Sequence, residues 1–328
     1  MIASRHVLTR RHALAGVLLL LPAAARAAEW PERPVRMIIP FAPGAGADIV
    51  GRTFAEELAK TLGQPIVVDN KGGAGGLMGT VEGARAPADG YTLLLTSQGT
   101  TVFNIGLYKA PGYDPLKDLV PVTVAGTLPN VLVVSPANPA ATVADLIAQA
   151  SAKPGELTYG SSGIGSSLHM SGVIFEQRTG VRLQHVPYRG APPAVLAVVN
   201  GEVTMGFFNT PTVLGQIKAG KLKALAVTSK DRSAILPDVP TMIEAGVPDF
   251  VVATWLGFAL PANTPNAIVS RLNAEINRIS QNPQVKEKLL VQGFEMRPPG
   301  SPEAARKLIE DDQALWLPII KQSGAKAE

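Results

Sequence analysis

Short apolar runs alternate with amphipathic stretches along most of the chain. The first apolar runs that read as buried strands are residues 36–40, 66–68 and 92–95. Residues 49–62 place Phe54, Leu58 and Leu62 at four-residue spacing, which predicts a helix that ends at Gly63. This alternation is typical of an α/β fold with mostly parallel strands.

A second unit with the same alternation begins near Pro129. Its predicted strands are residues 131–134, 157–159, 203–207 and 222–228, and its predicted helices are 143–152 and a segment from Ser166 to Arg178. A last segment starts with a strand at 255–260. Its helix over 265–279 has Thr264 as N-cap. The final helix opens at Ser301 and is expected to bury Leu308, Leu315, Trp316 and Ile319.

The first 27 residues have the order of a secretory signal peptide. Basic residues are followed by an apolar stretch at 13–21 and by the small-residue site Ala25-Arg26-Ala27. The apolar stretch is shorter than the roughly 20 residues that span a bilayer. We therefore expect a cleaved leader, 1–27, and a periplasmic protein; Arg10-Arg11 leaves export by the Sec or the Tat route open.

Removal of this leader makes the chain electrically neutral. The whole chain has 30 Lys and Arg against 26 Asp and Glu, and residues 1–27 hold four Arg and no acid. The remaining 26 basic and 26 acidic residues give no bulk attraction to nucleic acid or anionic lipid. We expect no nucleic-acid partner.

Residues that would carry catalysis or hold a metal are scarce. The chain has no Cys, and His169 and His185 are the histidines outside the leader. They lack the spacing of a metal pair and have no acidic cluster beside them. No nucleophile with a general base stands out. We expect no enzyme, no metal and no cofactor.

Two loops rich in small residues each lie between a predicted strand and a predicted helix, at 42–47 and 161–167. The free N–H groups at a helix start, together with the helix dipole, attract an anion. Each loop would supply hydrogen-bond donors without a fixed cation. The alternatives are a purely structural glycine turn at the first loop and simple N-capping by Ser166 at the second.

Neither loop carries a nucleotide or hydrolase signature. Ile49 stands where the third Gly of a dinucleotide fingerprint belongs, and no Gly-Lys-Ser/Thr follows. The segment from Gly160 to Ile164 has no register of G-x-S-x-G. NAD, ATP and serine hydrolysis are therefore disfavoured.

An ordered set of motifs resembles the substrate-binding proteins of tripartite tricarboxylate transporters, also called the Bug (Bordetella uptake gene) family. The motifs that carry the resemblance span the chain from 30 to 241 and include Ile39-Pro40-Phe41-Ala42-Pro43-Gly44, Asp89-Gly90-Tyr91-Thr92-Leu93, Tyr159-x-Ser161-Ser162-Gly163, His185-Val186-Pro187-Tyr188-Arg189-Gly190 and Leu236-Pro237-Asp238-Val239-Pro240-Thr241. No single motif is decisive, but their order is specific.

The resemblance implies a two-lobed periplasmic binding protein of the type II, Venus-flytrap kind, with a ligand cleft between its lobes. The first lobe would combine 28–127 with 253–328, and the second would hold 128–252. In this family a ligand carboxylate is held chiefly by backbone amides and waters from one loop of each lobe. The ligand-binding residues expected here are Phe41, Ala42, Gly44, Ala45, Asp48, Ser97, Thr100, Ser161, Ser162, Gly163, Ser166, His169, Phe208 and Asn209.

Departures from the family pattern bear on the ligand. Ala47 replaces the usual Thr, and Phe208 stands where an Asp is common. If Phe208 faces the cleft, both changes favour a carboxylate with an apolar or aromatic body, less polar than citrate. Asp48 could pair with a ligand amine or simply be a favourable charge at a helix start.

The resemblance also implies what the protein works with. We expect a monomer that captures a small carboxylate and passes it to membrane transporter subunits. A sensory protein that presents its ligand to a membrane signalling system would use the same cleft. A periplasmic hydrolase is the weaker alternative.

Overall fold

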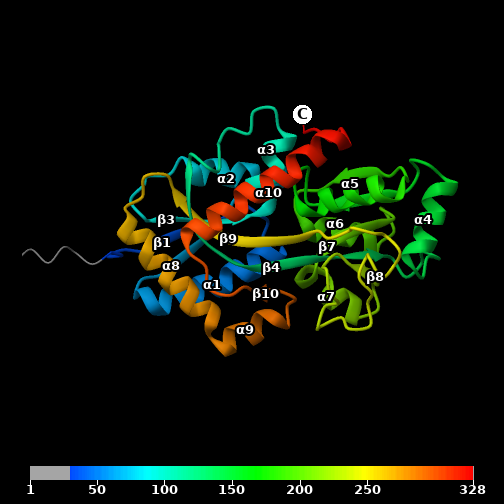
Figure 1. The fold of residues 1–328 in the computed structure, drawn as a ribbon. Helices are drawn as coiled ribbons and strands as arrows, with labels where there is room; N and C mark the ends of the chain where they lie inside the picture. Colours follow the sequence, from blue (N-terminus) through cyan, green and yellow to red (C-terminus); the bar gives the residue numbers. More distant parts are fainter. Residues whose placement is uncertain (1–29, 328) are drawn as a thin grey trace, which may run out of the picture.

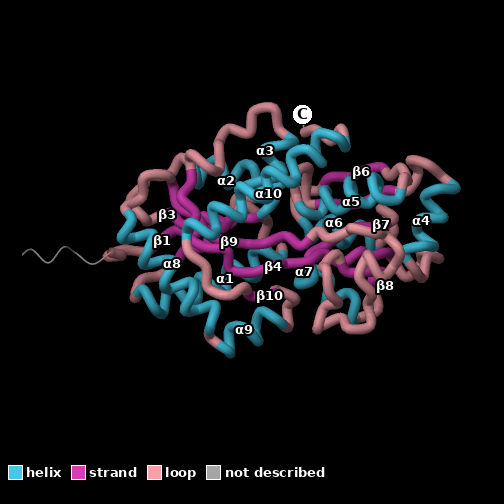
Figure 2. Tube along the Cα trace, viewed as in Figure 1, coloured by secondary structure: helices cyan, strands magenta, loops and turns pink. Residues whose placement is uncertain are grey.

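The computed structural model describes residues 30–327, so the predicted leader lies outside the described part of the chain. Two α/β lobes lie side by side along the long axis of the molecule (Figure 1). In each lobe, helices lie against the faces of a β-sheet (Figure 2). The two-lobed α/β fold expected from the sequence is confirmed.

The first lobe contains the strands β1 (Val35–Ile39), β2 (Ile66–Asn70), β3 (Thr92–Ser97), β9 (Ala253–Pro261) and β10 (Glu295–Met296), and the helices α1 (Gly46–Leu62), α2 (Leu77–Ala84), α8 (Asn266–Gln281) and α9 (Pro283–Leu290). Its strand order is β2-β1-β3-β9, followed by β4 (Leu119–Val134). β1 is parallel to β2 and β3, whereas β9 is antiparallel to β3 and β4.

The second lobe contains the strands β5 (Thr158–Ser161), β6 (Gln184–Pro187), β7 (Met205–Asn209) and β8 (Lys223–Val227), and the helices α4 (Val143–Ala152), α5 (Ser167–Thr179), α6 (Ala191–Val199) and α7 (Thr210–Lys218). β5 is parallel to β6 and β7. β7 and β8 both pair with β4 in the antiparallel sense.

Strand β4 belongs to both lobes. Its residues 119–129 pair with β9, and residues 130–134 pair with β7. We expected a strand only over 131–134, whereas the observed strand also contains Pro121 and Gly126, residues that are uncommon inside a strand. Two register shifts, at Pro121/Thr123 and Val124/Gly126, accommodate these residues. The expectation of mostly parallel strands is therefore corrected for the middle of the molecule.

A C-terminal helix, α10 (Pro302–Ser323), runs across the first lobe toward the second (Figure 1). Its Asp312 carboxylate accepts hydrogen bonds from Gln98 and from the Trp255 indole at 2.9 and 2.7 Å. Its Trp316 ring meets Phe103 of a short π-helical turn (Gly99–Phe103) edge to face at 5.1 Å. The turn continues into α3 (Asn104–Leu107). These contacts tie the end of β3 to the far end of the chain.

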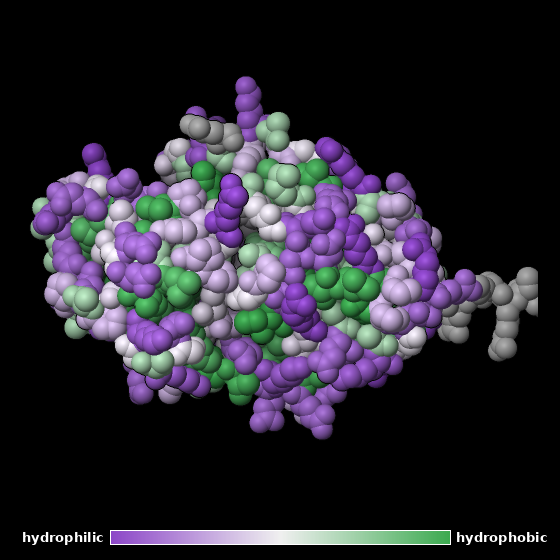
Figure 3. Space-filling view, turned by 180° about the vertical axis from the view of Figure 1, so that it is seen from behind, coloured by the Kyte–Doolittle hydropathy of each residue, from purple (hydrophilic) through white to green (hydrophobic). Residues whose placement is uncertain are grey.

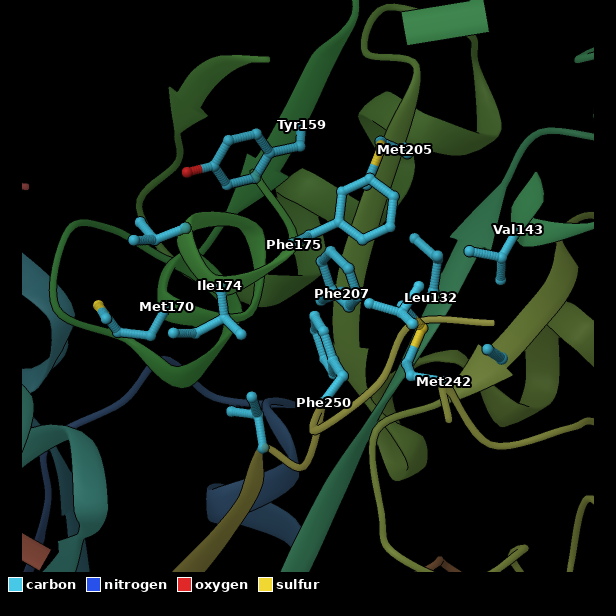
Figure 4. Packing of buried hydrophobic residues seen from close by; sticks show 14 of the residues in the cluster. Leu132, Val143, Tyr159, Met170, Ile174, Phe175, Met205, Phe207, Met242 and Phe250 are labelled. Atoms are coloured by element: carbon cyan, nitrogen blue, oxygen red, sulfur yellow. The ribbon is translucent and has the colours of Figure 1, made fainter. Parts of the chain in front are cut away.

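Each lobe has its own buried core. In the first, Phe54 of α1 packs edge to face on Phe258 of β9 at 5.1 Å. In the second, Phe207 stacks on Phe250 at 5.8 Å, among Leu132, Met205 and Phe175 (Figure 4). Trp316 belongs to this second cluster. The C-terminal helix thus contributes to the core of the second lobe.

Several predicted helices are shifted in the structure. α1 begins at Gly46 rather than at Ile49, and α8 begins at Asn266 with Pro265, not Thr264, as its N-cap. The buried stripe of α10 is Ala305, Ile309, Trp316 and Ile320. Of the four residues predicted to be buried, Trp316 is buried, Leu308 and Ile319 are partly buried, and Leu315 is 58 % exposed, so the prediction was wrong at Leu315.

None of the helices between residues 30 and 327 combines the length and apolar character that a membrane crossing requires. On the face shown in Figure 3, apolar residues form separate patches among hydrophilic ones.

Candidate functional site

A partly enclosed cavity lies between the two lobes. Its volume of about 30 Å³ exceeds the 10 to 15 Å³ that one water molecule needs by this measure. Its first-lobe lining comes from the loops after β1, β2 and β3, and its second-lobe lining comes from the loops after β5, β6 and β7. The strands that run between the lobes also contribute to the lining, with Leu128 from β4 and Thr254 and Leu256 from β9. The cavity is therefore where ligands bind in open α/β sheets, at the carboxyl ends of parallel strands.

The loop between β1 and α1 brings the start of α1 to the cavity. Ala45 is the N-cap, with extended backbone and no side-chain cap. Gly46 allows this approach, since an added Cβ would lie 2.9 Å from Asn209 and 3.0 Å from Leu128. Any larger residue would therefore push the helix start away from the second lobe.

The loop between β5 and α5 mirrors this arrangement from the other side. Ser166 caps α5 by accepting the His169 N–H at 3.2 Å, and its own hydroxyl donates to the Gly163 carbonyl at 2.7 Å. Ser162, Ser166, Ser167 and Leu168 line the cavity. The Ser166 hydroxyl is thus used within the loop, and N-capping by Ser166 is confirmed.

The first backbone N–H groups of both helices lack an acceptor. Within residues 30–327, no hydrogen bond links the N–H groups of Gly46 and Ala47, or those of Ser167 and Leu168, to another group of the protein. Such orphan donors are normal at a helix start, and the dipoles of the two helices add positive potential there. Two helix starts on different lobes therefore face one cavity.

Two further loops complete the cavity, and sequence reasoning did not assign them to the site. Gly72, Gly73 and Gly76 follow β2, and Arg189 to Ala191 follow β6. Because β2 is parallel to β1 and β6 is parallel to β5, these loops emerge at the same edges as the expected ones. The parallel pairing of the strands was the signal that could have found them.

Arg189 changes the expected electrostatics of the cavity. The two predicted loops indeed carry no cation, but Arg189 from the loop after β6 lines the cavity. Its side chain is exposed and forms no ion pair with any described residue. A guanidinium at the rim adds to the attraction of an anion without being buried in it.

The fourteen predicted residues divide equally. The seven that line the cavity are Phe41, Ala42, Ala45, Ser97, Ser162, Ser166 and Asn209. The seven that do not line it are Gly44, Asp48, Thr100, Ser161, Gly163, His169 and Phe208. The residues that do not line the cavity pack or bond behind the loops and strand ends that do.

Asp48 is the clearest of these supporting residues. Its carboxylate accepts hydrogen bonds from the Gly44 N–H, the Arg52 Nε and the Asn70 Nδ2, each at 2.9 Å. These three hydrogen bonds hold the Asp48 carboxylate against its own loop and the neighbouring strand β2. The structure supports its reading as a helix-start charge, and the idea of a bond to a ligand amine is corrected.

Thr100 and Gly163 hold the turns that present cavity residues. The Ser97 N–H donates to the Thr100 hydroxyl at 3.0 Å, and the Gly163 carbonyl accepts from the Ser166 N–H at 3.2 Å. Gly163 has a φ of +116°, which favours glycine, and Ser161 accepts its N–H at 3.1 Å.

Phe208 faces away from the cavity, contrary to the interpretation that its ring meets the ligand. The side chain is fully buried in the cluster of Val131, Leu168 and Val213. Neighbouring residues of a strand point to opposite faces, so Asn209 reaches the cavity because Phe208 does not. Gly206 leaves room for the ring, since an added Cβ would lie 2.2 Å from it.

Asn209 is fixed by a chain of amides. The Asn130 Nδ2 donates to the Ser167 carbonyl at 3.3 Å, which makes the Asn130 Oδ1 an acceptor for the Asn209 Nδ2 at 2.6 Å. This arrangement links the start of α5 to the end of β7. The amide of Asn209 is held rigidly at the cavity.

His169, which is buried, and His185, which is half-buried, form a pair behind the loop before α5. Their ring centres are 4.4 Å apart, and the His185 Nε2 lies 2.6 Å from the Ser161 hydroxyl. Burial lowers the pKa of His169 to about 3 and that of His185 to about 4. Both rings are therefore neutral at neutral pH. Among residues 30–327, no group of three or more His, Cys, Asp or Glu is placed to hold a metal ion.

Comparison with known proteins places these features in a family. The sequence pattern of the tripartite tricarboxylate transporter family receptor (TctC) matches residues 50–325. The chain is 39 % identical to protein BugT of Bordetella pertussis over 97 % of this chain and 99 % of that protein.

Solved structures agree with the sequence match. The R. palustris protein Rpa4515 with adipate is 36 % identical, with a TM-score of 0.88 over 91 % of this chain and 99 % of its own. Periplasmic binding protein BugD is 34 % identical, with a TM-score of 0.87 over 91 % of this chain and 100 % of its own.

Replacement of Gly75 by alanine should force the lobes apart. An added Cβ there would lie 2.1 Å from the Ile164 carbonyl oxygen of the second lobe, and Gly75 has a φ of +61°. We expect Gly75→Ala to enlarge the radius of gyration measured by solution X-ray scattering. Gly155→Ala is the control, because Gly155 has a similar φ of +81° but no atom within 4 Å. Identical scattering from both variants would contradict closure at this contact.

Proposed function

The chain belongs to the tripartite tricarboxylate transporter family of receptors, and on that premise we propose that it holds the carboxylate of a small acid between the starts of α1 and α5. It is a solute-binding protein, and members of its family are periplasmic binding proteins. The observation that carries the proposal is the pair of helix starts with unpaired N–H groups, one from each lobe, at a single partly enclosed cavity.

The chemistry of the cavity suits a carboxylate. The N–H groups of Gly46, Ala47, Ser167 and Leu168 are donors without acceptors, and the Ser162 and Ser167 hydroxyls are not used elsewhere among the described residues. A hydrogen bond to a charged acceptor contributes about 1.5 to 3 kcal/mol. A few such bonds account for micromolar binding, which corresponds to about 8 kcal/mol.

Bridging by the ligand would couple binding to closure. A carboxylate that accepts from α1 and α5 bonds to both lobes only when they are close together. A cradle of neutral amides, with Arg189 at its exposed rim, also releases an anion more readily than buried cations would. Both properties suit a carrier that passes its ligand to membrane transporter subunits. The related Rpa4515 has adipate bound, and we propose small carboxylates as the ligand class here.

We propose no catalytic role for the Ser161–His185 contact. The Ser161 hydroxyl is fully buried, does not line the cavity and accepts the Gly163 N–H. No carboxylate of the described residues bonds to His185, so the third member of a hydrolytic triad is missing. We infer that the contact between Ser161 and His185 stabilises the loop before α5 and has no part in hydrolysis.

We also propose lobe boundaries at 28–127 with 253–328 and at 128–252. The change of partner of β4 at Pro129 and Asn130 supports this division. The short elements at 99–107 and the end of α10 pack on the second lobe and would bridge the boundary.

The leader is the first testable part of this proposal. The basic, apolar and small-residue order of residues 1–27 should direct export, with a mature chain that starts at or near Ala28. N-terminal sequencing of the periplasmic fraction measures this. A chain that keeps Met1 and stays in the cytoplasm would refute it.

A variant that lacks the backbone N–H of Ser167 tests whether the start of α5 binds the carboxylate. Ser167 is the first residue of α5 and follows an extended Ser166, which is where proline fits a helix start. Ser167→Pro removes the N–H and the hydroxyl, whereas Ser167→Ala removes only the hydroxyl. Calorimetric titration with adipate should show binding at least about tenfold weaker for Ser167→Pro than for Ser167→Ala.

The neutral diamide of adipic acid provides a second control. It keeps the length of adipate but lacks the charge, so the wild-type protein should bind it far more weakly. Equal affinities of the two Ser167 variants for adipate would mean that the N–H of α5 does not hold the carboxylate.

A further inference from the structure

Part of the cavity wall is formed by β4 and β9, the strands that join the lobes. Thr254 and Leu256 of β9 line it, and Leu128 of β4 pairs with Thr254 in the sheet. Trp255, between the two β9 residues, instead donates its indole N–H to Asp312 on α10. This alternation places the side chains of Thr254 and Leu256 on the same face of β9, the face that lines the cavity.

The hydroxyl of Thr254 has no hydrogen-bond partner. Thr254 is 4 % exposed, and its Oγ1 is buried with no donor or acceptor from residues 30–327. Nearby buried threonines are satisfied: Thr228 donates to the Val252 carbonyl at 2.7 Å and Thr210 to the Pro129 carbonyl at 3.2 Å. A buried polar group without a partner is unusual and calls for an explanation.

We propose that Thr254 determines specificity by bonding a second oxygen function of the ligand, distinct from the carboxylate held by α1 and α5. This inference rests on the proposed carboxylate-binding function. Leu128 and Leu256, each 1 % exposed, would contact the methylene carbons of such a ligand on either side of the hydroxyl. The ligand class is a small aliphatic acid with a second oxygen function, a hydroxyl, oxo or carboxylate group.

One buried hydroxyl is sufficient to discriminate between acids that carry a second oxygen and acids that do not. A ligand oxygen at this position would bond to the Thr254 hydroxyl, whereas a purely hydrocarbon tail would leave that buried hydroxyl without a partner. Sites that bond a polar group reject analogues that lack it much more strongly than apolar pockets reject small changes of shape. The apolar-bodied ligand inferred from Phe208 loses its support, because that ring is not at the cavity.

The test compares two threonines whose hydroxyls are both buried and unpaired. Thr254 lines the cavity, whereas Thr212 of α7 does not. Valine has nearly the shape of threonine without the hydroxyl, so each valine variant should fold. A thermal-shift panel of C4 to C8 acids with and without a second oxygen, including adipate and hexanoate, identifies the acids that bind, and calorimetry gives their affinities.

The proposal gives a distinct pattern. Acids with a second oxygen should bind wild type best, and Thr254→Val should weaken them about tenfold, equivalent to about 1.4 kcal/mol, while leaving hexanoate unchanged or tighter. Thr254→Ser should keep most of the affinity, and Thr212→Val should match wild type.

Equal effects of Thr254→Val on adipate and hexanoate, or preferential binding of hexanoate by wild type, would overturn the role of Thr254. Failure of every acid in the panel to bind wild type would instead overturn the proposed function, and this inference with it. The Ser167 variants distinguish failure of the proposed function from failure of the Thr254 role, because they change the N–H groups at the start of α5 and leave Thr254 in place.

Discussion

The unpaired N–H groups at the starts of α1 and α5 are the constraint on which the rest of the site depends. The closed lobes shield these donors from bulk water, and a donor that is buried without an acceptor lowers stability. An anion between α1 and α5 would accept hydrogen bonds from both helix starts and would interact favourably with both helix dipoles. The small residues of the surrounding loops follow from this requirement, because side chains at Gly46 or Gly75 would keep the two backbones apart.

The change of partner along the shared strand β4 is where a hinge between the two lobes would lie. β4 pairs with β9 in one lobe and with β7 in the other, so the change of partner at Pro129 and Asn130 lies next to the cavity. Asn130 also bonds to Ser167 and Asn209. Rotation of one lobe about this point would change the distance between the helix starts and would leave both cores intact, the one around Phe54 and the one around Phe207.

The sequence correctly predicted the class of fold and the position of the two loops, each between a strand and a helix, because these depend on local periodicity and on glycine and serine at helix starts. It missed features that depend on pairing between distant segments. The long β4 was hidden by its prolines, and the cavity loops at Gly72 and Arg189 became visible only once β2 and β6 were known to be parallel to their neighbours. Phe208 was placed on the wrong face because the register of β7 was unknown. Thr254 carries no local signal at all, since its unpaired hydroxyl is a property of the tertiary structure.

Backbone NMR of the isotope-labelled protein during titration with adipate tests the central claim most directly. Hydrogen bonding to a carboxylate moves an amide proton downfield, and four assigned amides report on the cradle. The account predicts downfield shifts for Gly46 and Ala47 of α1 and for Ser167 and Leu168 of α5, with the same dependence on adipate concentration. Shifts confined to one of the two helices, or absent from all four amides while adipate binds elsewhere, would contradict it.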